Sequence, residues 1–352
     1  MRRLALLVMA VSLLAASPAR LQKVLDRAVQ RGIPGLQACV TGRGIDWVGV
    51  AGVADKKGIP VTPTTRFRIA SSSKTMVAAT ALILVGEGKL GLDDPVARYL
   101  TPEVASHFPR GITVRMLMNH TSGLEDYLGQ EIDFDEAARK NPRREWTHFE
   151  TLRYGYDLEP VGKPGQKHYY SNTNYILLGV VLEKVTGEPI GTTMQKRLFT
   201  PLGMRHTYCG LYARAPAETA RGYAEEGDVS YYNPGDGLAD GGVLSTAPDM
   251  AIFLRALLEK KLLKPAQQKA LMTFVATDER DCTYGLGLAR YDTEQGVCYG
   301  HDGSIDGYRS AMYYFEDSAL VTVALGNTTM RDEVFDSLTE SLEAAAGKPE
   351  RD

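Results

Sequence analysis

The sequence predicts an α+β fold, in which one antiparallel sheet is assembled from both ends of the chain and flanked by helices. Three observations lead to this prediction. Residues 36–55 alternate, are rich in β-branched side chains and are punctuated by glycine, as in a two-stranded hairpin. Strand-like runs return after residue 280, and the stretch between them, about residues 95–235, is helical and rich in loops.

No repeat, low-complexity run or Pro/Ser-rich linker divides the 352 residues, so any domains must be interwoven. We expect a sheet domain from residues 20–75 and 240–352, with an inserted, mostly helical subdomain from residues 76–239. Charged residues make up 24% of the chain and the formal charge is −3, which gives no indication of a nucleic-acid partner. We expect a monomer.

The first 19 residues, "MRRLALLVMAVSLLAASPA", have the three-part build of a secretory signal peptide. Arg2 and Arg3 precede an apolar run that is too short to span a bilayer, and small residues follow it. Cleavage between Ala16 and Ala19 would change the formal charge from −3 to −5 by removing both arginines. We therefore expect an exported protein, periplasmic or secreted, and the alternative is a short buried N-terminal helix.

The next elements follow from hydrophobic periodicity and glycine positions. The hairpin at residues 36–55 is followed by "KTMVAATALILVG", which is apolar on every side from Met76 to Leu84 and predicts a helix buried in the core. "TVRMLMNHTSG" predicts the end of a helix at Gly123, and "NTNYILLGVVLEKVTG" predicts another helix that stops at Gly187.

The C-terminal third returns to strands. "APDMAIFLRALLEKKLL" predicts an amphipathic helix, and "DEVFDSLTESLEAAA" predicts a closing one. Between them lie three strand-like runs, "TYGLGLARYD", "GVCYGHDG" and "YRSAMYYFEDSALVTVALGN".

Four cysteines, Cys39, Cys209, Cys282 and Cys298, do not make a dense disulfide framework. A hairpin centred near Glu294 would place Cys298 opposite Arg290, roughly 27 Å along the strand from Cys282. That separation is far beyond a disulfide, and the sequence assigns no particular pairing to the four cysteines.

The stretch "RIASSSKTMV" is the first candidate site. If a helix begins at about Ser71, Lys74 lies one turn further on the same face, whereas Ser72 and Ser73 point about 200° and 100° away from it. A lysine against a buried apolar helix can lose its proton near neutral pH and act as a base for the Ser71 hydroxyl. The alternative for Ser71 is that it caps the helix. We expect Ser72 and Ser73 to cap and pack the helix start.

"HYYSNTNY" is the second candidate site, directly before a buried helix. Tyr170 could relay a proton to a leaving group, and Asn172 could donate a hydrogen bond to a substrate carbonyl. In the alternative interpretation, Asn172 or Asn174 caps the helix and Tyr170 is half-buried packing.

"YGHDGS" at residues 299–304 is the third candidate site, on a strand. Gly303 would let a substrate backbone approach closely, and the amide of Ser304 could face an oxyanion together with the amide of Ser71. His301 would give a positive or hydrogen-bonding group in the same cleft.

Several other motifs do not occur. The sequence contains no G-x-S-x-G elbow, H-E-x-x-H zinc pair, Walker A loop or complete G-x-G-x-x-G. Its six histidines have no metal-ligand spacing, so we expect neither a metal nor an organic cofactor.

The three candidate sites, in this order, resemble the motifs of the penicillin-recognising serine hydrolases, which comprise class C β-lactamases, soluble DD-peptidases and related esterases. The resemblance covers about residues 20–345, and it implies a β-lactamase/transpeptidase-like fold. Other stretches that look like this family are "FRIASSSK", "GKLGLDDPV", "NHTSGL", "PGQKHYYSNTNY", "GGVLSTAPDM" and "YGLGL".

The third site is similar to one branch of this family. Class C β-lactamases usually carry lysine at the position of His301, and His-x-Gly looks more like D-alanyl-D-alanine carboxypeptidases, D-aminopeptidases and some esterases. Two positions depart from the carboxypeptidase branch. Asp302 is expected to put a carboxylate beside the cleft, and Ala289 stands where an arginine would help to bind a substrate carboxylate. Arg290 is expected to face the other way.

The resemblance implies a serine hydrolase that works through an acyl-enzyme. Ser71 is the expected nucleophile, Lys74 its base and Tyr170 the proton shuttle. The residues expected to bind substrate or oxyanion are Asn172, His301, Gly303 and Ser304.

We expect a D-alanyl-D-alanine carboxypeptidase-like enzyme that acts on D-Ala-D-Ala-type peptides and is acylated by β-lactams. The enzymatic alternatives are an esterase, a class C-type β-lactamase or a D-aminopeptidase. A catalytically silent penicillin-binding-like sensor is the non-enzymatic alternative, and the intact Ser71, Lys74 and Tyr170 argue against it.

Overall fold

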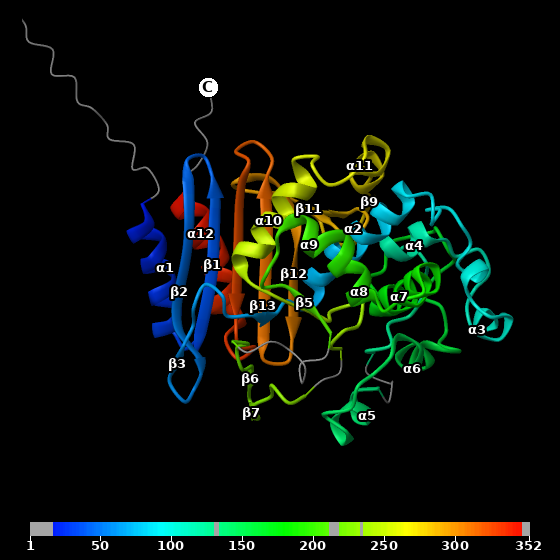
Figure 1. Ribbon diagram of the computed structural model, residues 1–352, viewed down its shortest axis with the longest axis horizontal. Helices are drawn as coiled ribbons and strands as arrows, with labels where there is room; N and C mark the ends of the chain where they lie inside the picture. Colours follow the sequence, from blue (N-terminus) through cyan, green and yellow to red (C-terminus); the bar gives the residue numbers. More distant parts are fainter. Residues whose placement is uncertain (1–16, 130–133, 211–217, 233–234, 347–352) are drawn as a thin grey trace, which may run out of the picture.

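The computed structural model describes residues 17–129, 134–210, 218–232 and 235–346 (Figure 1). Its centre is a nine-stranded antiparallel sheet with the strand order β3-β2-β1-β14-β13-β12-β11-β10-β9. The strands are β1 (Gly35–Gly42), β2 (Ile45–Asp55), β3 (Ile59–Pro60), β9 (Val275–Ala276), β10 (Cys282–Tyr284), β11 (Ala289–Thr293), β12 (Gly296–Ile305), β13 (Tyr308–Phe315) and β14 (Leu320–Gly326).

Strands from the two ends of the chain pair inside this sheet. Leu36 of β1 lies opposite Gly326 of β14, and Thr41 lies opposite Val321. The prediction of one antiparallel sheet assembled from both ends and flanked by helices is therefore confirmed, as is the hairpin β1–β2.

Helices cover both faces of the sheet. α1 (Pro18–Gln30) and α12 (Asp332–Ala346) pack on one face through residues such as Leu25 and Leu338, against Ala324 of β14. α10 (Ala247–Leu258) packs on the opposite face, to which Val323 of β14 belongs. In Figure 1, α1 lies at the left, beside β2, α12 shows in red behind β1 and β2, and α10 lies in front of the sheet.

The predicted signal peptide falls almost entirely outside the described residues. Pro18 and Ala19, which we assigned to it, form the first turn of α1, and the Ser17 side chain caps this helix by accepting a hydrogen bond from the Arg20 amide (3.2 Å). Within the described ranges, no helix is long and apolar enough to cross a membrane.

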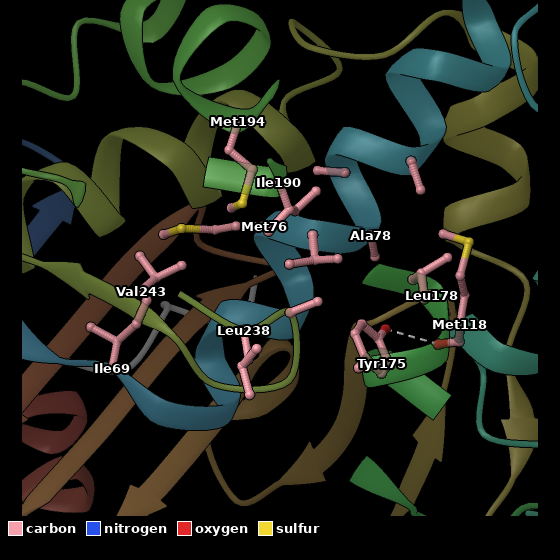
Figure 2. Close-up of a cluster of buried hydrophobic side chains, with 14 of the residues drawn as sticks. Ile69, Met76, Ala78, Met118, Tyr175, Leu178, Ile190, Met194, Leu238 and Val243 are labelled. Atoms are coloured by element: carbon pink, nitrogen blue, oxygen red, sulfur yellow. Dashed lines mark hydrogen bonds between the residues drawn. The ribbon is translucent and has the colours of Figure 1, made fainter. Parts of the chain in front are cut away.

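Helix α2 (Ser73–Gly86) is the buried helix that the sequence predicted. Figure 2 shows Met76 and Ala78 of α2 in a cluster of apolar side chains from several helices, where the Tyr175 hydroxyl donates to the Met118 carbonyl (3.1 Å). Because α2 is enclosed in this way, Lys74 in its first turn is fully buried.

Short helices and two small sheets fill the middle of the chain. The helices are α3 (Pro102–Ser106), α4 (Val114–Met118), α5 (Phe134–Lys140), α6 (His148–Leu152), α7 (Asn172–Thr186), α8 (Ile190–Met194) and α9 (Thr200–Leu202), and α11 (Pro265–Leu271) follows α10. The small sheets are β4 (Phe67–Arg68), β8 (Val243–Ser245) and β5 (Tyr208–Cys209), and β6 (Tyr223–Ala224) with β7 (Gly227–Asp228).

Of the two predicted helix ends, one agrees with the structure and one does not. α7 ends at Gly187, which has φ +69°, as predicted. The other helix whose end was predicted, α4, ends at Met118 and not at Gly123. The reason is that His120 takes a left-handed conformation (φ +56°), which turns the chain out of the helix.

The predicted strand "TYGLGLARYD" is two strands, β10 and β11. The chain reverses between them, where the Gly285 amide donates to the Leu288 carbonyl (2.8 Å). As a result, Cys282 and Cys298 both lie opposite Tyr291, on its two sides, and Cys298 does not lie opposite Arg290. All four cysteines are free. Cys282 and Cys298 cannot pair because two strand spacings of about 4.8 Å separate them.

Candidate active site

Ser71 lies in a single 3₁₀ turn, η1 (Ala70–Ser72), between β4 and α2. Ala70 has a left-handed backbone (φ +47°), which costs a non-glycine residue about 1–3 kcal/mol and persists only where the surroundings enforce it. Such strain clusters at functional sites. The turn presents Ser71 to a surface cavity, while Ser72 is buried.

The Lys74 side chain returns from the first turn of α2 to Ser71. Its Nζ lies 3.0 Å from Ser71 Oγ, 2.8 Å from Asn172 Oδ1 and 2.6 Å from the Asp240 carbonyl oxygen. Three residues from three separate segments therefore surround one buried amine. The structure brings Ser71, Lys74 and Asn172 together, and their catalytic roles remain predictions.

Neither Ser72 nor Ser73 caps α2, contrary to our expectation. Ser72 Oγ lies 2.8 Å from Ser310 Oγ and donates to the His301 carbonyl (3.2 Å), and Ser73 Oγ accepts from the Val243 amide (3.2 Å). Both hydroxyls point away from Lys74, toward strands. Because these strands lie against the helix start, they offer the two serines partners outside the helix.

Asn172 is the first residue of α7, and its amide group is oriented from both sides. Its Nδ2 donates to Asp126 Oδ2 (2.8 Å), which leaves Oδ1 facing Lys74. Burial raises the pKa of Asp126. The capping alternative is wrong, because no side chain caps α7 and Asn174 instead accepts from the Ser122 hydroxyl (2.5 Å).

Tyr170 belongs to an aromatic cluster beside Lys74. Its ring centroid lies 5.1 Å from Lys74 Nζ and 4.3 Å from the centroid of the His120 ring, on which it stacks. Burial holds the pKa of His120 well below its ordinary value, so the ring is neutral. Tyr284 closes the cluster, at 5.0 Å from His120.

His301 lies on β12 and is buried. Its Nε2 shares a hydrogen bond with the Tyr284 hydroxyl (2.9 Å), and its Nδ1 lies 2.5 Å from the Asp302 carbonyl oxygen. Burial lowers the pKa of His301 to about 4. Of the two possibilities left open by the sequence, the structure therefore supports a neutral hydrogen-bonding group.

Gly303 is where β12 meets η1. A Cβ atom at this position would lie 2.5 Å from the Ile69 carbonyl oxygen and 2.8 Å from the Ser71 amide nitrogen. A larger residue would push the strand away from Ser71. Ser304, the next residue, lines the same cavity as Ser71.

Asp302 does not lie beside the cleft, contrary to our expectation. Strand alternation turns its carboxylate to the other face of the sheet, although Oδ1 stays 3.9 Å from His301 Nδ1. On that face, burial and, after it, the charge of Asp302 raise the pKa of Tyr291 and Tyr313. Arg290 also lies outside the cleft, where both of its terminal nitrogens bind Asp292 (2.8 and 2.9 Å).

A cavity of about 240 Å³ opens beside Ser71. Its described lining carries three carboxylates, Asp135, Asp240 and Asp306, and one cation, Arg139, and is otherwise largely aromatic, apolar or glycine. The residues that line it are Ala70, Ser71, Tyr127, Leu128, Phe134, Asp135, Arg139, Asn172, Tyr232, Gly235, Asp240, Gly241, Ser304, Ile305 and Asp306.

The family model described as "Beta-lactamase" matches residues 19–346. The chain belongs to the β-lactamase family. This family of serine hydrolases includes penicillin-binding protein 4* of Bacillus subtilis (strain 168), which is 28% identical over 314 residues, 84% of this chain and 67% of the relative.

Two solved structures that are similar to this chain are a D-stereospecific amidohydrolase and a D-amino acid amidase. A D-stereospecific amidohydrolase from Streptomyces sp. is 31% identical, with a TM-score of 0.79 over 94% of this chain and 98% of that chain. D-amino acid amidase from Ochrobactrum anthropi SV3, complexed with D-phenylalanine, is 26% identical, with a TM-score of 0.81 over 93% and 97%.

Sequence reasoning missed four members of the site: His120, Asp126, Asp240 and Tyr284. His120 and Tyr284 fall in "NHTSGL" and "YGLGL", which we quoted for their resemblance to the family but to which we gave no role. Asp240 directly precedes the glycine pair Gly241–Gly242, and this turn signal alone does not show that its carbonyl group reaches Lys74. In the part of the chain that the structure describes, no group of His, Cys, Asp or Glu is arranged to hold a metal ion.

Proposed function

We propose that this protein is a serine amidohydrolase that forms an acyl-enzyme on Ser71 and cleaves amides of small D-amino acids. The observation that carries this proposal is the set of three oxygen atoms around Lys74 Nζ. These oxygen atoms fix the orientation of the amine's hydrogens and lone pair once Lys74 has lost a proton.

A neutral amine has two hydrogens and one lone pair. The Asn172 Oδ1 and the Asp240 carbonyl oxygen can only accept, so they hold both hydrogens of neutral Lys74. The lone pair then faces Ser71 Oγ at 3.0 Å. In this arrangement Lys74 takes the Ser71 proton as the oxygen attacks the substrate carbonyl.

The other groups complete the acyl transfer. In our proposal, the amides of Ser71 and Ser304 stabilise the oxyanion, and the close approach at Gly303 sets the spacing between them. Tyr170, held against His120, relays to the leaving amine the proton that Lys74 took from Ser71, and it activates water for deacylation.

The charges around the site favour an uncharged leaving group. Neutral His301 offers no cation for a substrate carboxylate, and Arg290 is occupied by Asp292. A D-alanyl-D-alanine carboxypeptidase must bind such a carboxylate, so this finer prediction receives no support from the described charges. The two amidohydrolases among the solved relatives support an amide substrate instead.

The first test is acylation by benzylpenicillin, read as the intact mass of the protein. We expect an adduct that forms slowly on the wild type, because the described charges offer no free cation to the penicillin carboxylate. We expect none on Ser71→Ala, whose fold is checked by circular dichroism. The same adduct on Ser71→Ala would contradict the assignment of the nucleophile. Hydrolysed penicillin without an adduct would identify a β-lactamase.

The second test compares D-phenylalanine amide with N-acetyl-D-alanyl-D-alanine as substrates. We expect a higher kcat/KM for the amide. Faster cleavage of the carboxylate-terminated dipeptide would replace our proposal with a carboxypeptidase. If the protein cleaves neither compound, is not acylated by benzylpenicillin and does not hydrolyse p-nitrophenyl acetate, it is a silent binding protein.

A further inference from the structure

Asp240 is a buried carboxylate that the proposed mechanism does not use. The residue is 6% exposed, and it lines the cavity beside Ser71. Its Oδ2 accepts a hydrogen bond from the Tyr127 hydroxyl (2.8 Å), whereas no described residue donates to its Oδ1. Leaving a buried oxygen without a hydrogen-bond donor costs about 1–3 kcal/mol. We therefore expect a ligand in the cavity to supply a donor to this oxygen.

The position of Asp240 relative to the candidate nucleophile is fixed. Its carbonyl oxygen accepts from Lys74 Nζ, so a single amine separates it from Ser71 Oγ. The preceding amide, that of Ala239, donates to His148 Nε2 (2.8 Å), which anchors the loop to α6. The backbone of Asp240 is therefore held one amine away from Ser71, and both residues line the cavity that an acyl group on Ser71 would enter.

The other charges of the cavity do not neutralise Asp240. Arg139 is engaged by Asp135 (2.7 Å) and Asp306 (3.3 Å), and Lys74 already contacts three acceptors. The described lining has an excess of negative charge. A cationic group entering the cavity would find this charge and the vacant acceptor Oδ1 together.

From these observations we propose that Asp240 binds the α-ammonium group of the substrate and selects amino-acid derivatives with a free amine over those that are blocked or lack it. This inference rests on the proposed amidohydrolase function, and it names the residue that recognises the substrate. The aromatic rings of Tyr127, Phe134 and Tyr232 in the same lining would receive an apolar side chain.

The test uses two anilides that differ only in the amine: D-phenylalanine p-nitroanilide and 3-phenylpropionyl p-nitroanilide. In the wild type, we expect kcat/KM to be about 10- to 100-fold higher for D-phenylalanine p-nitroanilide. This ratio corresponds to the contribution of one hydrogen bond between charged groups. Asp240→Asn keeps the shape of the side chain and removes its charge, and it should abolish most of this preference.

Two further variants serve as controls. Asp292→Asn removes an exposed carboxylate that pairs with Arg290 and is not part of the cavity lining, and this variant should keep the preference. Asp306→Asn removes another carboxylate of the cavity lining, one that pairs with Arg139. If Asp306→Asn loses the preference and Asp240→Asn keeps it, the proposal is wrong about the residue.

A second measurement does not depend on the folding of any variant. With p-nitrophenyl acetate as substrate of the wild type, 2-phenylethylamine should inhibit at least 10-fold more strongly than 2-phenylethanol. Equal inhibition, or equal kcat/KM for the two anilides, would overturn the role of Asp240 and leave the amidohydrolase proposal intact. Failure to hydrolyse either anilide or the ester would overturn both.

Discussion

The histidines around Tyr170 are neutral because they are buried. His120 and His301 contact tyrosine rings and carry depressed pKa values, with that of His301 lowered to about 4. In the unfolded chain, both would bind a proton near their ordinary pKa of about 6.5. Between about pH 4 and 6.5, the unfolded state therefore binds more protons than the folded state.

This difference predicts that the protein loses stability in mild acid. The free energy of unfolding should fall as the pH is lowered from about 6.5 toward 4, by up to ~1.4 kcal/mol per pH unit for each histidine. Urea titrations at pH 7.5, 6.0 and 5.0 measure this slope. His301→Gln should flatten it, and an unchanged slope in that variant would contradict the assignment.

Lys74 gives a second prediction at the scale of the residue. Arginine stays protonated at all practical pH values, so Lys74→Arg keeps the charge and loses the base. We expect acylation by benzylpenicillin, followed as intact mass over time, to slow by about 10²- to 10⁴-fold. Lys264→Arg is the matched control, since Lys264 also donates to a backbone carbonyl of α2 (Gly86, 2.6 Å). Equal loss in both variants would point to a structural effect.

The site was predictable where its geometry is local. Ser71 and Lys74 are three residues apart, so helical periodicity alone places them together. Asp240 is 166 residues from Lys74, and its contact depends on a loop whose path no periodicity describes. Asp302 is a local case that we predicted wrongly. Strand alternation puts it on the face opposite His301 and Gly303, so its orientation follows once these two residues are known to form the site face of β12.

At the scale of elements, the approach of β12 to η1 is the critical contact. Gly303→Ala would place a Cβ 2.5 Å from the Ile69 carbonyl oxygen, and the strand would have to move away from Ser71. Because displacements of about 1 Å in an active site can cost 10²-fold, we expect kcat/KM to fall at least that far.

Gly86→Ala is the control for that variant. This glycine ends α2, and an added Cβ would meet no atom closer than 3.6 Å. Its kcat/KM should match the wild type, and its thermal stability should rise slightly because alanine favours helices. Full activity in Gly303→Ala would show that the close approach is not needed.

Elements with strong patterns were predicted, and those with ambiguous patterns were not. α2 is apolar all round, which indicates burial without any tertiary information. In contrast, "TYGLGLARYD" reads as one strand, although the turn at Gly285–Leu288 divides it. We read the start of α1 as part of a leader, because Pro18 and Ala19 suit a cleavage region as well as a helix start.

For the whole molecule, the four free cysteines make a prediction about redox state. Cys39 and Cys298 are buried, and burial raises the pKa of Cys39 to about 12, so its thiolate is scarce. Alkylation in denaturant should label four thiols by mass, whereas alkylation of the native protein should be slow. A reducing agent should leave Tm unchanged, and a lower Tm in its presence would reveal a disulfide.

The pairing of β1 with β14 has a consequence for how the chain acquires its structure. Leu36 and Gly326 become neighbours although about 290 residues separate them. The first hairpin must therefore wait, with an open edge, until the last strand has left the ribosome. Such a chain folds slowly and late, and a ribosome-bound fragment that ends before β14 should remain sensitive to protease.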